Sequence, residues 1–300
     1  MGMWGAVSNM NNSRLISGAD VLSGVIDRYQ RGIGPELWRT GYPKWNPFEI
    51  GPSLVSVIGA PPKTGKTALS MQIVSDTLIR NPELKAYVCN CEMAPGALMA
   101  RMLARYSGIT ADDVRFGRRG SGDDARLENG LRRMAAFASR MVFYTGPFAI
   151  DCITDTFGRA GAEPGLLLVD YLQRLRLNAK DSGDDRRVEL ENVMTALRGL
   201  ADAGLGIIAI SAVARQRGHG GSDYAGIGLA SLRGSSELEY GADSIWLMHS
   251  GGPDATDKGE AAPKPEGLVL FECAANRHGD TASIPLVFDK RHMAFHILDI

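Results

Sequence analysis

The sequence predicts an α/β fold, in which a mostly parallel sheet is flanked by helices and ends in antiparallel strands at its C-terminal edge. From residue 54 onward, short and nearly continuous apolar runs alternate with segments of helical periodicity. Strands that are buried on both faces have this apolar character, and alternation with helices is typical of parallel sheets. From Leu268 to Ile300, strand-like runs follow one another with no helical pattern between them, which indicates antiparallel pairing.

The individual elements follow from these two periodicities and from helix end signals. The runs that we interpret as strands are Leu54–Ile58, Ala86–Cys91, Met141–Tyr144, Leu166–Val169, Ile207–Ile210, Ser244–Met248 and Leu268–Cys273. The segments that we interpret as helices in the same region are Gly65–Ile79, Pro95–Tyr106, Asp123–Ser139, Ile150–Arg159 and Arg187–Ala203. Two glycine-rich stretches, Gly218–Gly228 and Gly251–Gly267, are expected to be mobile loops.

Three regions are expected along the chain. Residues 1–17 are rich in Gly, Asn and Ser and are expected to form a disordered N-terminal arm. Residues 18–52 combine an amphipathic helix at Gly18–Arg31 with a connecting segment that contains prolines and two tryptophans, and residues 53–300 form the α/β domain. One apolar stripe of the helix must pack either on its own domain or on a neighbouring subunit. This stripe consists of Val21, Leu22, Val25, Ile26 and Tyr29.

Composition and charge narrow the possible classes of function. The 300 residues are 44% hydrophobic and 22% charged, which excludes a wholly disordered chain. Because the net charge is −1, any binding of nucleic acid must come from a local basic lining. The four cysteines form no C-x-x-C pair, and we expect buried thiols rather than zinc ligands or disulfides. The sequence has no apolar stretch of membrane-spanning length and no signal peptide, so we expect a cytoplasmic protein with no membrane partner.

A phosphate-binding loop is indicated by the segment A-P-P-K-T-G-K-T, which lies between an apolar run and a helical pattern. In that context backbone N–H groups and the helix N-terminus surround an anion. Lys66 then reaches the β- and γ-phosphates of a nucleotide, and the Thr67 hydroxyl holds Mg²⁺. A chance G-K-T in a loop would lack the strand before it and the helix after it. The residues expected to contact the nucleotide are Ala60, Pro61, Pro62, Lys63, Thr64, Gly65, Lys66, Thr67 and Ala68, with Ala60 in place of the usual first glycine.

Two carboxylates end predicted strands near this loop. Asp170 follows the apolar run Leu166–Val169, and a carboxylate at that point can hold a Mg²⁺-bound water beside the phosphates. Glu92 follows the first predicted strand after the loop, at the carboxyl edge where parallel sheets bind ligands. It can orient and deprotonate the water that attacks the γ-phosphate. The residues alone leave a second interpretation open, in which Glu92 is an acid favoured by the dipole of the following helix.

Three further motifs accompany the phosphate-binding loop and share its order along the chain. They are E-M at Glu92-Met93, V-D-Y-L-Q at Val169–Gln173 and S-L-R-G-S-S-E-L-E-Y-G-A-D at Ser231–Asp243. Together they resemble the RecA-like motor domain of DnaB-type replicative helicases. The resemblance runs from about Gly18 to near the C-terminus and implies a RecA-like P-loop NTPase core. The family's globular N-terminal collar is not matched, and we expect the chain to lack it, since about 17 residues precede the linker-like helix.

The resemblance implies roles for individual residues. It makes Lys66, Thr67 and Asp170 the ligands of ATP and Mg²⁺, and Glu92 the catalytic base. It places an adenine-stacking side chain at Arg101 and an arginine finger, which reaches the γ-phosphate of the neighbouring subunit, at Arg277. It makes Gly18–Arg31 a helix that docks on the adjacent protomer and closes a ring. The residues that it places on the backbone of single-stranded DNA are Arg233, Gly234, Ser235 and Ser236.

The sequence departs from the family pattern at two coupling positions. The strand that ends near Ser211 is usually followed by a glutamine that senses the γ-phosphate, and this chain has Ala212. The arginine finger is usually preceded, two positions earlier, by a basic residue, and this chain has Ala275. Arg215 is a candidate to relay the signal instead of residue 212, because its guanidinium can reach a phosphate.

Two functions of different classes remain open from the sequence. The first is a ring-forming, ATP-hydrolysing helicase on single-stranded DNA, which is a homo-oligomer, expected to be hexameric. The resemblance alone implies a 5′–3′ polarity and a separate primase or loader partner for such a motor. The second is a nucleotide-gated regulatory ATPase, similar to a recombinase or a loader, that assembles with ATP without unwinding DNA. Ala212 and Ala275 favour the second function, whereas Arg277, Arg233 and the linker-like helix favour the first.

Overall fold

The computed structural model describes residues 15–41, 43–159, 163, 165–177, 186–213, 228–232, 235–250 and 265–298. The chain divides into two compact units, Met1–Glu36 and Leu37–Ile300. The smaller unit contains helix α1 (Gly18–Gln30), which begins where the predicted amphipathic helix Gly18–Arg31 begins and ends one residue before it. Ser17 begins it, because its side chain accepts a hydrogen bond from the Asp20 N–H at 3.1 Å. The five apolar side chains of the predicted stripe are 45–86% exposed.

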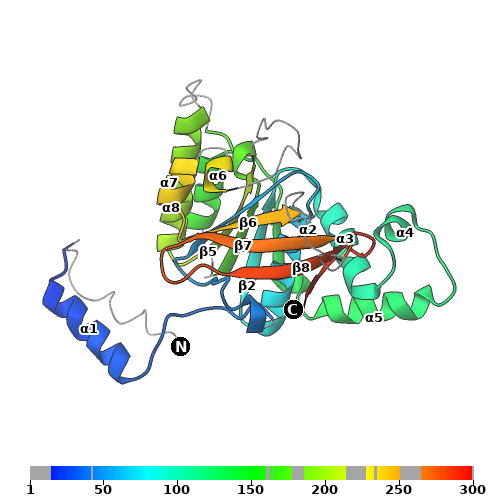
Figure 1. Cartoon of the computed structure of the whole chain (residues 1–300), viewed down its shortest axis with the longest axis horizontal. Helices are drawn as coiled ribbons and strands as arrows, with labels where there is room; N and C mark the ends of the chain where they lie inside the picture. The colour runs from blue at the N-terminus through cyan, green and yellow to red at the C-terminus, as the bar shows by residue number, and fades with distance from the viewer. Residues whose placement is uncertain are drawn as a thin grey trace, which may run out of the picture. The chain divides into compact units, whose positions relative to one another are not determined.

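The larger unit is built on a mixed sheet, which Figure 1 shows with helices beside it. The nine strands in the described residues lie in the order β3-β2-β4-β5-β1-β6-β7-β8-β9. Strands β1 to β6 pair in parallel, and β7 to β9 pair antiparallel. Both predicted features of the sheet are therefore confirmed. The strands are β1 (Val55–Ala60), β2 (Lys85–Asn90), β3 (Met141–Tyr144), β4 (Gly165–Asp170), β5 (Gly206–Ala212), β6 (Ser244–Ser250), β7 (Leu268–Asn276), β8 (Ser283–Asp289) and β9 (Ala294–Ile297).

Helices cover the sheet as two layers, each with its own apolar cluster. One cluster joins the sheet to α2, α3 and α5, and the other joins it to α6, α7 and α8. The helices are α2 (Lys66–Arg80), α3 (Pro95–Ser107), α4 (Ala111–Phe116), α5 (Asp123–Ala135), α6 (Ile150–Thr154), α7 (Arg186–Asp202) and α8 (Ser235–Gly241). Short 3₁₀ turns lie at Pro43–Trp45, Ala138–Arg140, Leu172–Arg174 and Leu229–Ser231. Within the described residues, no helix is both long enough and apolar enough to cross a membrane.

The helices differ from the prediction in four places. The predicted helix Asp123–Ser139 ends at Ala135, and Ala138–Arg140 then forms a 3₁₀ turn. The predicted helix Ile150–Arg159 is α-helical to Thr154 and continues as a π-helical turn. Helices α4 and α8 were not predicted, because six and seven residues are too few to show a helical period. Most of Gly218–Gly228 and Gly251–Gly267, like the arm at residues 1–14, lies outside the described residues.

The connecting segment after residue 36 belongs to the core of the larger unit. Trp45, Phe48 and Ile50 are each no more than 2% exposed. Phe48 packs edge-on against Trp246 of β6, with ring centroids 5.4 Å apart, and both contact Phe271 of β7. Residues 37–52 were grouped with the linker-type helix on sequence grounds, whereas these aromatic contacts make them part of the α/β core.

Candidate nucleotide-binding and hydrolysis site

The phosphate-binding loop connects β1 to α2, as the motif predicts. Gly65 caps α2 with a φ of +91°, a left-handed conformation that favours glycine. A Cβ atom at Gly65 would lie 2.7 Å from the Phe288 ring and 2.8 Å from the Phe295 ring, which stack on each other at 4.3 Å. Glycine is therefore required here both by the backbone and by the packing of β8 and β9. The loop presents the first N–H groups of α2 to the carboxyl edge of the sheet, where an anion is favoured.

Ala60 departs from the usual motif without disturbing the loop. It is the last residue of β1, it is 1% exposed, and it pairs with Ala212 of β5. Its φ is not in the positive range that would require glycine. A methyl group is therefore accommodated in regular strand geometry, and the turn that surrounds the phosphate begins after it.

Thr67 and Asp170 meet at the carboxyl edge, although 103 residues separate them in the sequence. The Thr67 hydroxyl donates to Oδ2 of Asp170 at 2.6 Å. The other carboxylate oxygen, Oδ1, is buried and has no hydrogen-bond partner in the described part of the structure. A buried carboxylate oxygen without a partner is costly, and a hydroxyl with a carboxylate is the donor set that Mg²⁺ takes in P-loop proteins. These two residues therefore fit a Mg²⁺ ion.

The electrostatics of Asp170 agree with a cation site. Burial raises the pKa of Asp170 above its ordinary value, and the Glu92 carboxylate acts in the same direction. The Thr67 hydroxyl, the Lys66 ammonium and the Asn90 amide act in the opposite direction and lower this pKa. A divalent cation beside Oδ1 would add strongly to the second group of effects, because it favours the ionised carboxylate.

Asn90 is a site residue that was not predicted from the sequence. It ends β2 beside Asp170, which ends β4, and its Nδ2 donates to Asp170 Oδ2 at 2.9 Å. Its Oδ1 accepts from the N–H groups of Glu92 at 3.0 Å and Met93 at 2.7 Å. One amide thus fixes the carboxylate and the turn that carries Glu92. A polar residue that ends an apolar run two positions before Glu92 was the available signal.

Glu92 lies at the position predicted for a catalytic base. Its side chain is exposed at the start of the turn before α3, and its charge is close enough to raise the pKa of Asp170. An exposed carboxylate near a Mg²⁺ ligand can accept a proton from a water molecule at the γ-phosphate. Lys66, at the first position of α2, lies with its Nζ 5.6 Å from the centroid of the Tyr171 ring, directly after Asp170. The three charged groups named by the motifs therefore lie at one edge of the sheet.

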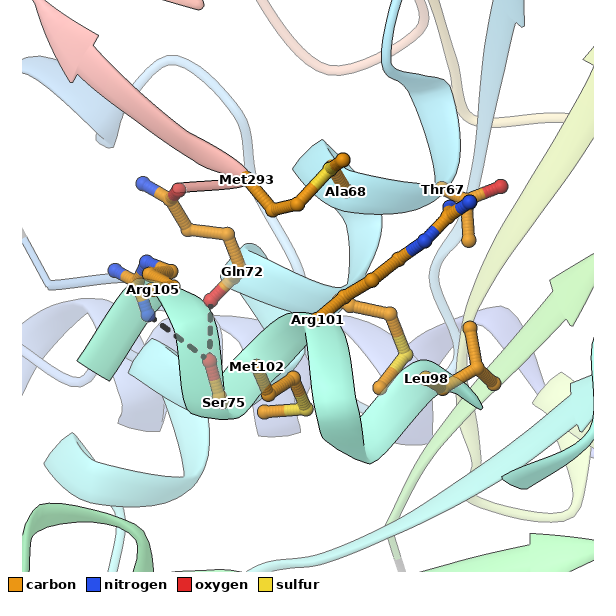
Figure 2. A pocket seen from close by; sticks show the side chains of 10 residues that line it. Thr67, Ala68, Gln72, Ser75, Leu98, Arg101, Met102, Arg105 and Met293 are labelled. Atoms are coloured by element: carbon orange, nitrogen blue, oxygen red, sulfur yellow. Dashed lines mark hydrogen bonds between the residues drawn. The ribbon is translucent and has the colours of Figure 1, made fainter. Parts of the chain in front are cut away.

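Arg101 extends from α3 into a pocket between α2 and α3, as Figure 2 shows. Thr67 and Ala68 of the phosphate-binding helix line the same pocket, so Arg101 faces the nucleotide side. The walls are largely apolar side chains, Met71, Leu98, Met102 and Met293. The planar guanidinium of Arg101 can itself stack on a flat base.

Helix α3 is held in place one turn after Arg101 by a buried ion pair. The Arg105 guanidinium contacts both carboxylate oxygens of Asp76 on α2, at 2.8 and 2.9 Å, with both side chains less than 15% exposed. Burial raises the pKa of Asp76 despite the opposing effect of Arg105. Removing one partner of such a pair is costly, because it leaves a buried charge without compensation.

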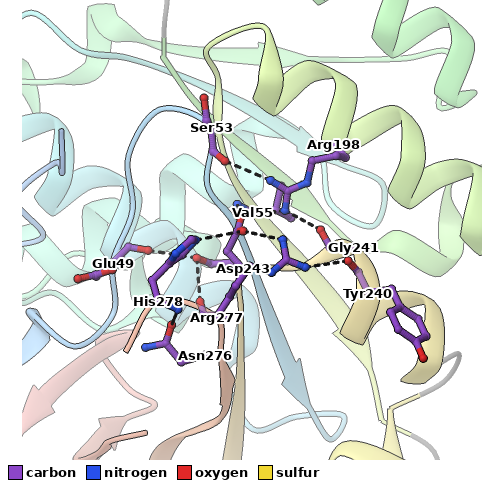
Figure 3. Close-up of polar contacts among 12 residues, drawn as sticks. Glu49, Ser53, Val55, Arg198, Tyr240, Gly241, Asp243, Asn276, Arg277 and His278 are labelled. Atoms are coloured by element: carbon purple, nitrogen blue, oxygen red, sulfur yellow. Dashed lines mark hydrogen bonds and ion pairs between the residues drawn. The ribbon is translucent and has the colours of Figure 1, made fainter. Parts of the chain in front are cut away.

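Arg277 lies at the opposite edge of the sheet from the phosphate-binding loop. It follows β7, whose end pairs with the start of β6, and β6 runs parallel to β1. Its Nη1 contacts Asp243 Oδ1 at 3.1 Å, and Asp243 Oδ2 accepts from the N–H of Val55, the first residue of β1 (Figure 3). Five residue steps along β1 span about 16 Å. Arg277 therefore cannot reach the phosphate-binding loop of its own chain, and a second copy must supply the loop for it to act on a nucleotide.

Most of the residues expected to contact DNA lie outside the described part of the chain. Arg215, Arg233 and Gly234 are among them, and Ser235 is described only as the first residue of α8. The Ser236 hydroxyl hydrogen-bonds to the Glu237 carboxylate at 3.3 Å. Ser236 also lines a groove to which three arginines contribute, namely Arg174, Arg176 and Arg187. Glu189 and Glu237 line the same groove and pair with Arg176 at 3.5 Å and with Arg187 at 2.6 Å, so its lining is of mixed charge rather than strongly basic.

The backbone of Ala212, at the end of β5, is hydrogen-bonded to the side chain of Gln173, which follows β4. The backbone N–H of Ala212 donates to Gln173 Oε1 at 3.0 Å, and Gln173 Nε2 donates to the Ser211 hydroxyl at 2.8 Å. Gln173 lies three residues after Asp170, in the V-D-Y-L-Q motif. A side-chain amide, that of Gln173, thus lies beside residue 212, although the alanine at this position has no side-chain amide of its own. Gln173 was not assigned a role from the sequence, and its place in that motif was the signal.

Comparisons with known proteins agree with this geometry. The family described as DnaB-like helicase C terminal domain matches residues 47–297. The replicative DNA helicase DnaB of Treponema pallidum is 27% identical over 248 residues, which are 80% of this chain and 50% of that protein. The replicative DNA helicase DnaC of Bacillus subtilis is 25% identical over 247 residues, which are 80% of this chain and 51% of that protein. The chain therefore spans about half the length of both relatives.

Two solved structures have the same fold. One is an isolated ATPase domain, which superposes with a TM-score of 0.76 at 21% identity and covers 94% of this chain and 99% of that one. The other is a DnaB-like replicative helicase, described with its interactions with primase; it also has a TM-score of 0.76, at 20% identity, and covers 98% of this chain and 70% of that one. The RecA-like architecture is confirmed by these superpositions. Because the family match covers most of the sequence, the chain belongs to the DnaB-like helicase C-terminal domain family.

Proposed function

We propose that this chain is the ATP-hydrolysing motor of a replicative-type DNA helicase that acts on single-stranded DNA. The observation that carries the proposal is the division of the hydrolytic site between two edges of one sheet. The phosphate-binding loop, Asp170 and Glu92 lie at one edge, and Arg277 lies at the other. A site that is completed by a neighbouring copy suits an assembly whose subunits hydrolyse ATP in a coordinated order. The relatives named as replicative helicases favour the motor over a regulatory ATPase.

Each residue of the nucleotide site has a distinct task in this proposal. The N–H groups of the loop and the Lys66 ammonium hold the β- and γ-phosphates of ATP. Thr67 and Asp170 hold Mg²⁺, which when bound neutralises charge on the phosphate oxygens. Glu92 accepts the proton of the attacking water, and Arg101 stacks on the adenine. Met71, Leu98 and Met102, which line the pocket with Arg101, are buried, so stacking on the base involves the planar guanidinium of Arg101 rather than these side chains.

The functional assembly is a ring of identical subunits, expected to be a hexamer. Arg277 of one copy faces the γ-phosphate held by the loop of the next and stabilises the charge that develops there. Helix α1 docks through its exposed apolar stripe on a neighbouring copy, because a helix with such a stripe is not stable in water on its own.

The DNA contacts are to backbone phosphates and are independent of base sequence. Arg233, with residues 234–236, supplies the main contact, and Arg174, in the groove beside Ser236, adds a further cation. Arg215 senses whether the γ-phosphate is present and transmits this to the DNA contacts, the role that a glutamine at residue 212 has in the family. The motor moves 5′–3′ and works with a separate primase or loader. The DnaB-like helicase of similar fold, described with its interactions with primase, supports the primase partner.

The decisive experiment measures ATP turnover with and without single-stranded DNA at several salt concentrations. Stimulation of several-fold is expected at low salt, and it should fade as salt rises, because phosphate contacts release counterions. Arg233→Ala should lower the ratio of stimulated to basal turnover. Arg132→Ala is the matched control, since Arg132 is an exposed arginine of α5 whose ion pair, among the described residues, is with Glu128 one turn earlier on the same helix. If turnover does not respond to DNA at any salt concentration, translocation is refuted and the regulatory ATPase remains.

A mixing experiment tests the shared site. Arg277→Ala protein should bind ATP and hydrolyse it poorly, whereas Lys66→Ala protein should fail to bind it. When the two are mixed, some interfaces pair an intact loop with an intact finger, so turnover should partly recover. The absence of recovery at every ratio, in mixtures shown by sedimentation to contain both variants, would refute a site shared between subunits.

A further inference from the structure

Asp243 is a carboxylate that binds several groups at the edge of the sheet where Arg277 lies. Its side chain is 7% exposed. Oδ2 accepts from the Val55 N–H and from Arg198 Nη2, each at 2.8 Å. Oδ1 accepts from Arg277 Nη1 at 3.1 Å and lies 3.4 Å from His278 Nε2. Figure 3 shows these groups converging on the carboxylate from β1, α7 and the end of β7.

The two arginines on this carboxylate are held differently. Arg198 is 25% exposed, and its guanidinium also donates to the carbonyls of Gly241 at 2.7 Å and Ser53 at 3.2 Å. It is therefore fixed between α7, α8 and the start of β1. Arg277 is 48% exposed, and its second contact is the Tyr240 carbonyl at the end of α8, at 3.0 Å. Arg198 is thus the inner partner of Asp243, and Arg277 is the outer one.

Arg277 can leave Asp243 without leaving the buried Asp243 carboxylate uncompensated. Burial opposes the ionised form of Asp243, but the Val55 N–H, Arg198 and Arg277 outweigh it, and the pKa of Asp243 lies below its ordinary value. If Arg277 turns outward, Arg198 and Val55 still compensate the carboxylate. A buried carboxylate with a single cationic partner would be left unpaired by the same movement, at a large cost. Two cations on one anion therefore make the outer one exchangeable.

We propose that Asp243 is a positioning residue that aims the Arg277 guanidinium toward the neighbouring subunit, with Arg198 as the fixed counter-ion that keeps Arg277 exchangeable. This inference rests on the proposed shared site. Arg277 has five N–H donors in a rigid fork. Asp243 Oδ1 accepts a hydrogen bond from Nη1 and the Tyr240 carbonyl accepts one from Nη2, and we call these two acceptors the seat of Arg277. The seat holds the fork at the protein surface with its remaining donors available. Its effect is on the transition state, where the position of the guanidinium decides how much charge it stabilises.

The test compares Asp243→Asn and Asp243→Glu with the wild-type assembly. Asp243→Asn keeps an acceptor but loses the charge, and Asp243→Glu keeps the charge but moves it by one methylene. Asp243→Glu keeps a carboxylate for Arg198 and covers the case in which Asp243→Asn does not fold. Both should lower kcat about tenfold or more, since a shift of about 1 Å in a catalytic group has such effects. The KM for ATP should change less than twofold, because the seat lies at the far end of β1 from the nucleotide. Glu272→Gln, on β7, is the matched control for loss of one carboxylate, and its kcat should stay at the wild-type value.

Two further measurements separate positioning from general damage. The double variant Asp243→Asn/Arg277→Ala should be no slower than Arg277→Ala alone, because Asp243 acts through Arg277. Asp243→Asn mixed with Lys66→Ala should regain turnover, since the second protein supplies a seated finger, whereas Asp243→Asn mixed with Arg277→Ala should not.

Three outcomes would overturn the inference or its premise. If both Asp243 variants keep the wild-type kcat while Arg277→Ala is slow, the seat is refuted and the shared site stands. If Asp243→Asn slows Arg277→Ala further, Asp243 acts by a route other than the finger. If Arg277→Ala itself turns over at the wild-type rate, the shared site fails, and the seat fails with it.

Discussion

Asn90 offers a sharp test of the candidate site, because its side-chain amide binds the Asp170 carboxylate and also the backbone turn that carries Glu92. Asn90→Ala removes the donor to Asp170 at 2.9 Å and the acceptor for the N–H groups of Glu92 and Met93 at 3.0 and 2.7 Å. The bond to the buried carboxylate is charge-assisted, and its loss costs about 1.5–3 kcal/mol. Water can replace the acceptor at the half-buried turn, so the other two bonds together contribute about 1 kcal/mol. We expect the free energy of unfolding to fall by about 2.5–4 kcal/mol.

The larger consequence should be for turnover. Without the amide, the turn after β2 is free to move, and Glu92 moves with it. A misplacement of about 1 Å can cost about 10²-fold in rate, so kcat should fall at least tenfold beyond any loss of folded protein. Asn81→Ala is the matched control. Asn81 also makes three hydrogen bonds, to Thr77 and to the backbone of Arg39, but it lies at the end of α2 away from the phosphate-binding loop.

The assay combines thermal unfolding with steady-state ATP turnover of both variants under identical assembly conditions. A loss of about 3 kcal/mol corresponds to a fall of about 6–12 °C in Tm for a domain of this size. Turnover should be measured well below both transitions. If Asn90→Ala retains the kcat of Asn81→Ala, the amide does not position Glu92 or Asp170 for catalysis, and the reasoning from these three bonds is wrong.

Two other predictions concern the phosphate-binding loop and the catalytic base. Lys66→Ala should abolish or greatly weaken ATP binding, whereas Glu92→Gln should bind ATP normally and turn it over about 10²-fold more slowly, as a nucleotide-binding titration and single-turnover kinetics would show. A Glu92→Gln protein with near-normal turnover would remove Glu92 from the reaction. Gly65→Ala should destabilise the domain by about 2–5 kcal/mol, from the left-handed backbone and the clash with Phe288 and Phe295, measured by chemical denaturation. A stability within about 0.5 kcal/mol of wild type would contradict the packing of β8 and β9 on the loop.

The sequence was sufficient wherever a structural feature depends on residues that are close together in the chain. The phosphate-binding loop was recognisable because one strand, one turn and one helix N-terminus form the whole cradle within about twelve residues. Asp170 and Glu92 were recognisable because each ends an apolar run, and the carboxyl ends of parallel strands meet at one edge. The antiparallel edge followed from the absence of helical periodicity after Leu268. These are local or periodic signals, and the sheet topology confirms the mostly parallel sheet with its antiparallel edge.

Contacts between distant segments were decided only by the tertiary structure. Asn90 is hydrogen-bonded to Asp170 over a sequence separation of 80 residues, and Val55 to Asp243 over 188. No local sequence pattern predicts either contact. Strand order alone places Arg277 at the edge away from its own phosphate-binding loop, which is why the proposed role of Arg277 calls for a second copy. The aromatic side chains at residues 45–50 resemble part of a linker in sequence, yet they complete the core, because burying apolar area against β6 and β7 outweighs any local preference. Sequence periodicity reports which face of an element is apolar, whereas the partner of each face depends on how the whole sheet is ordered.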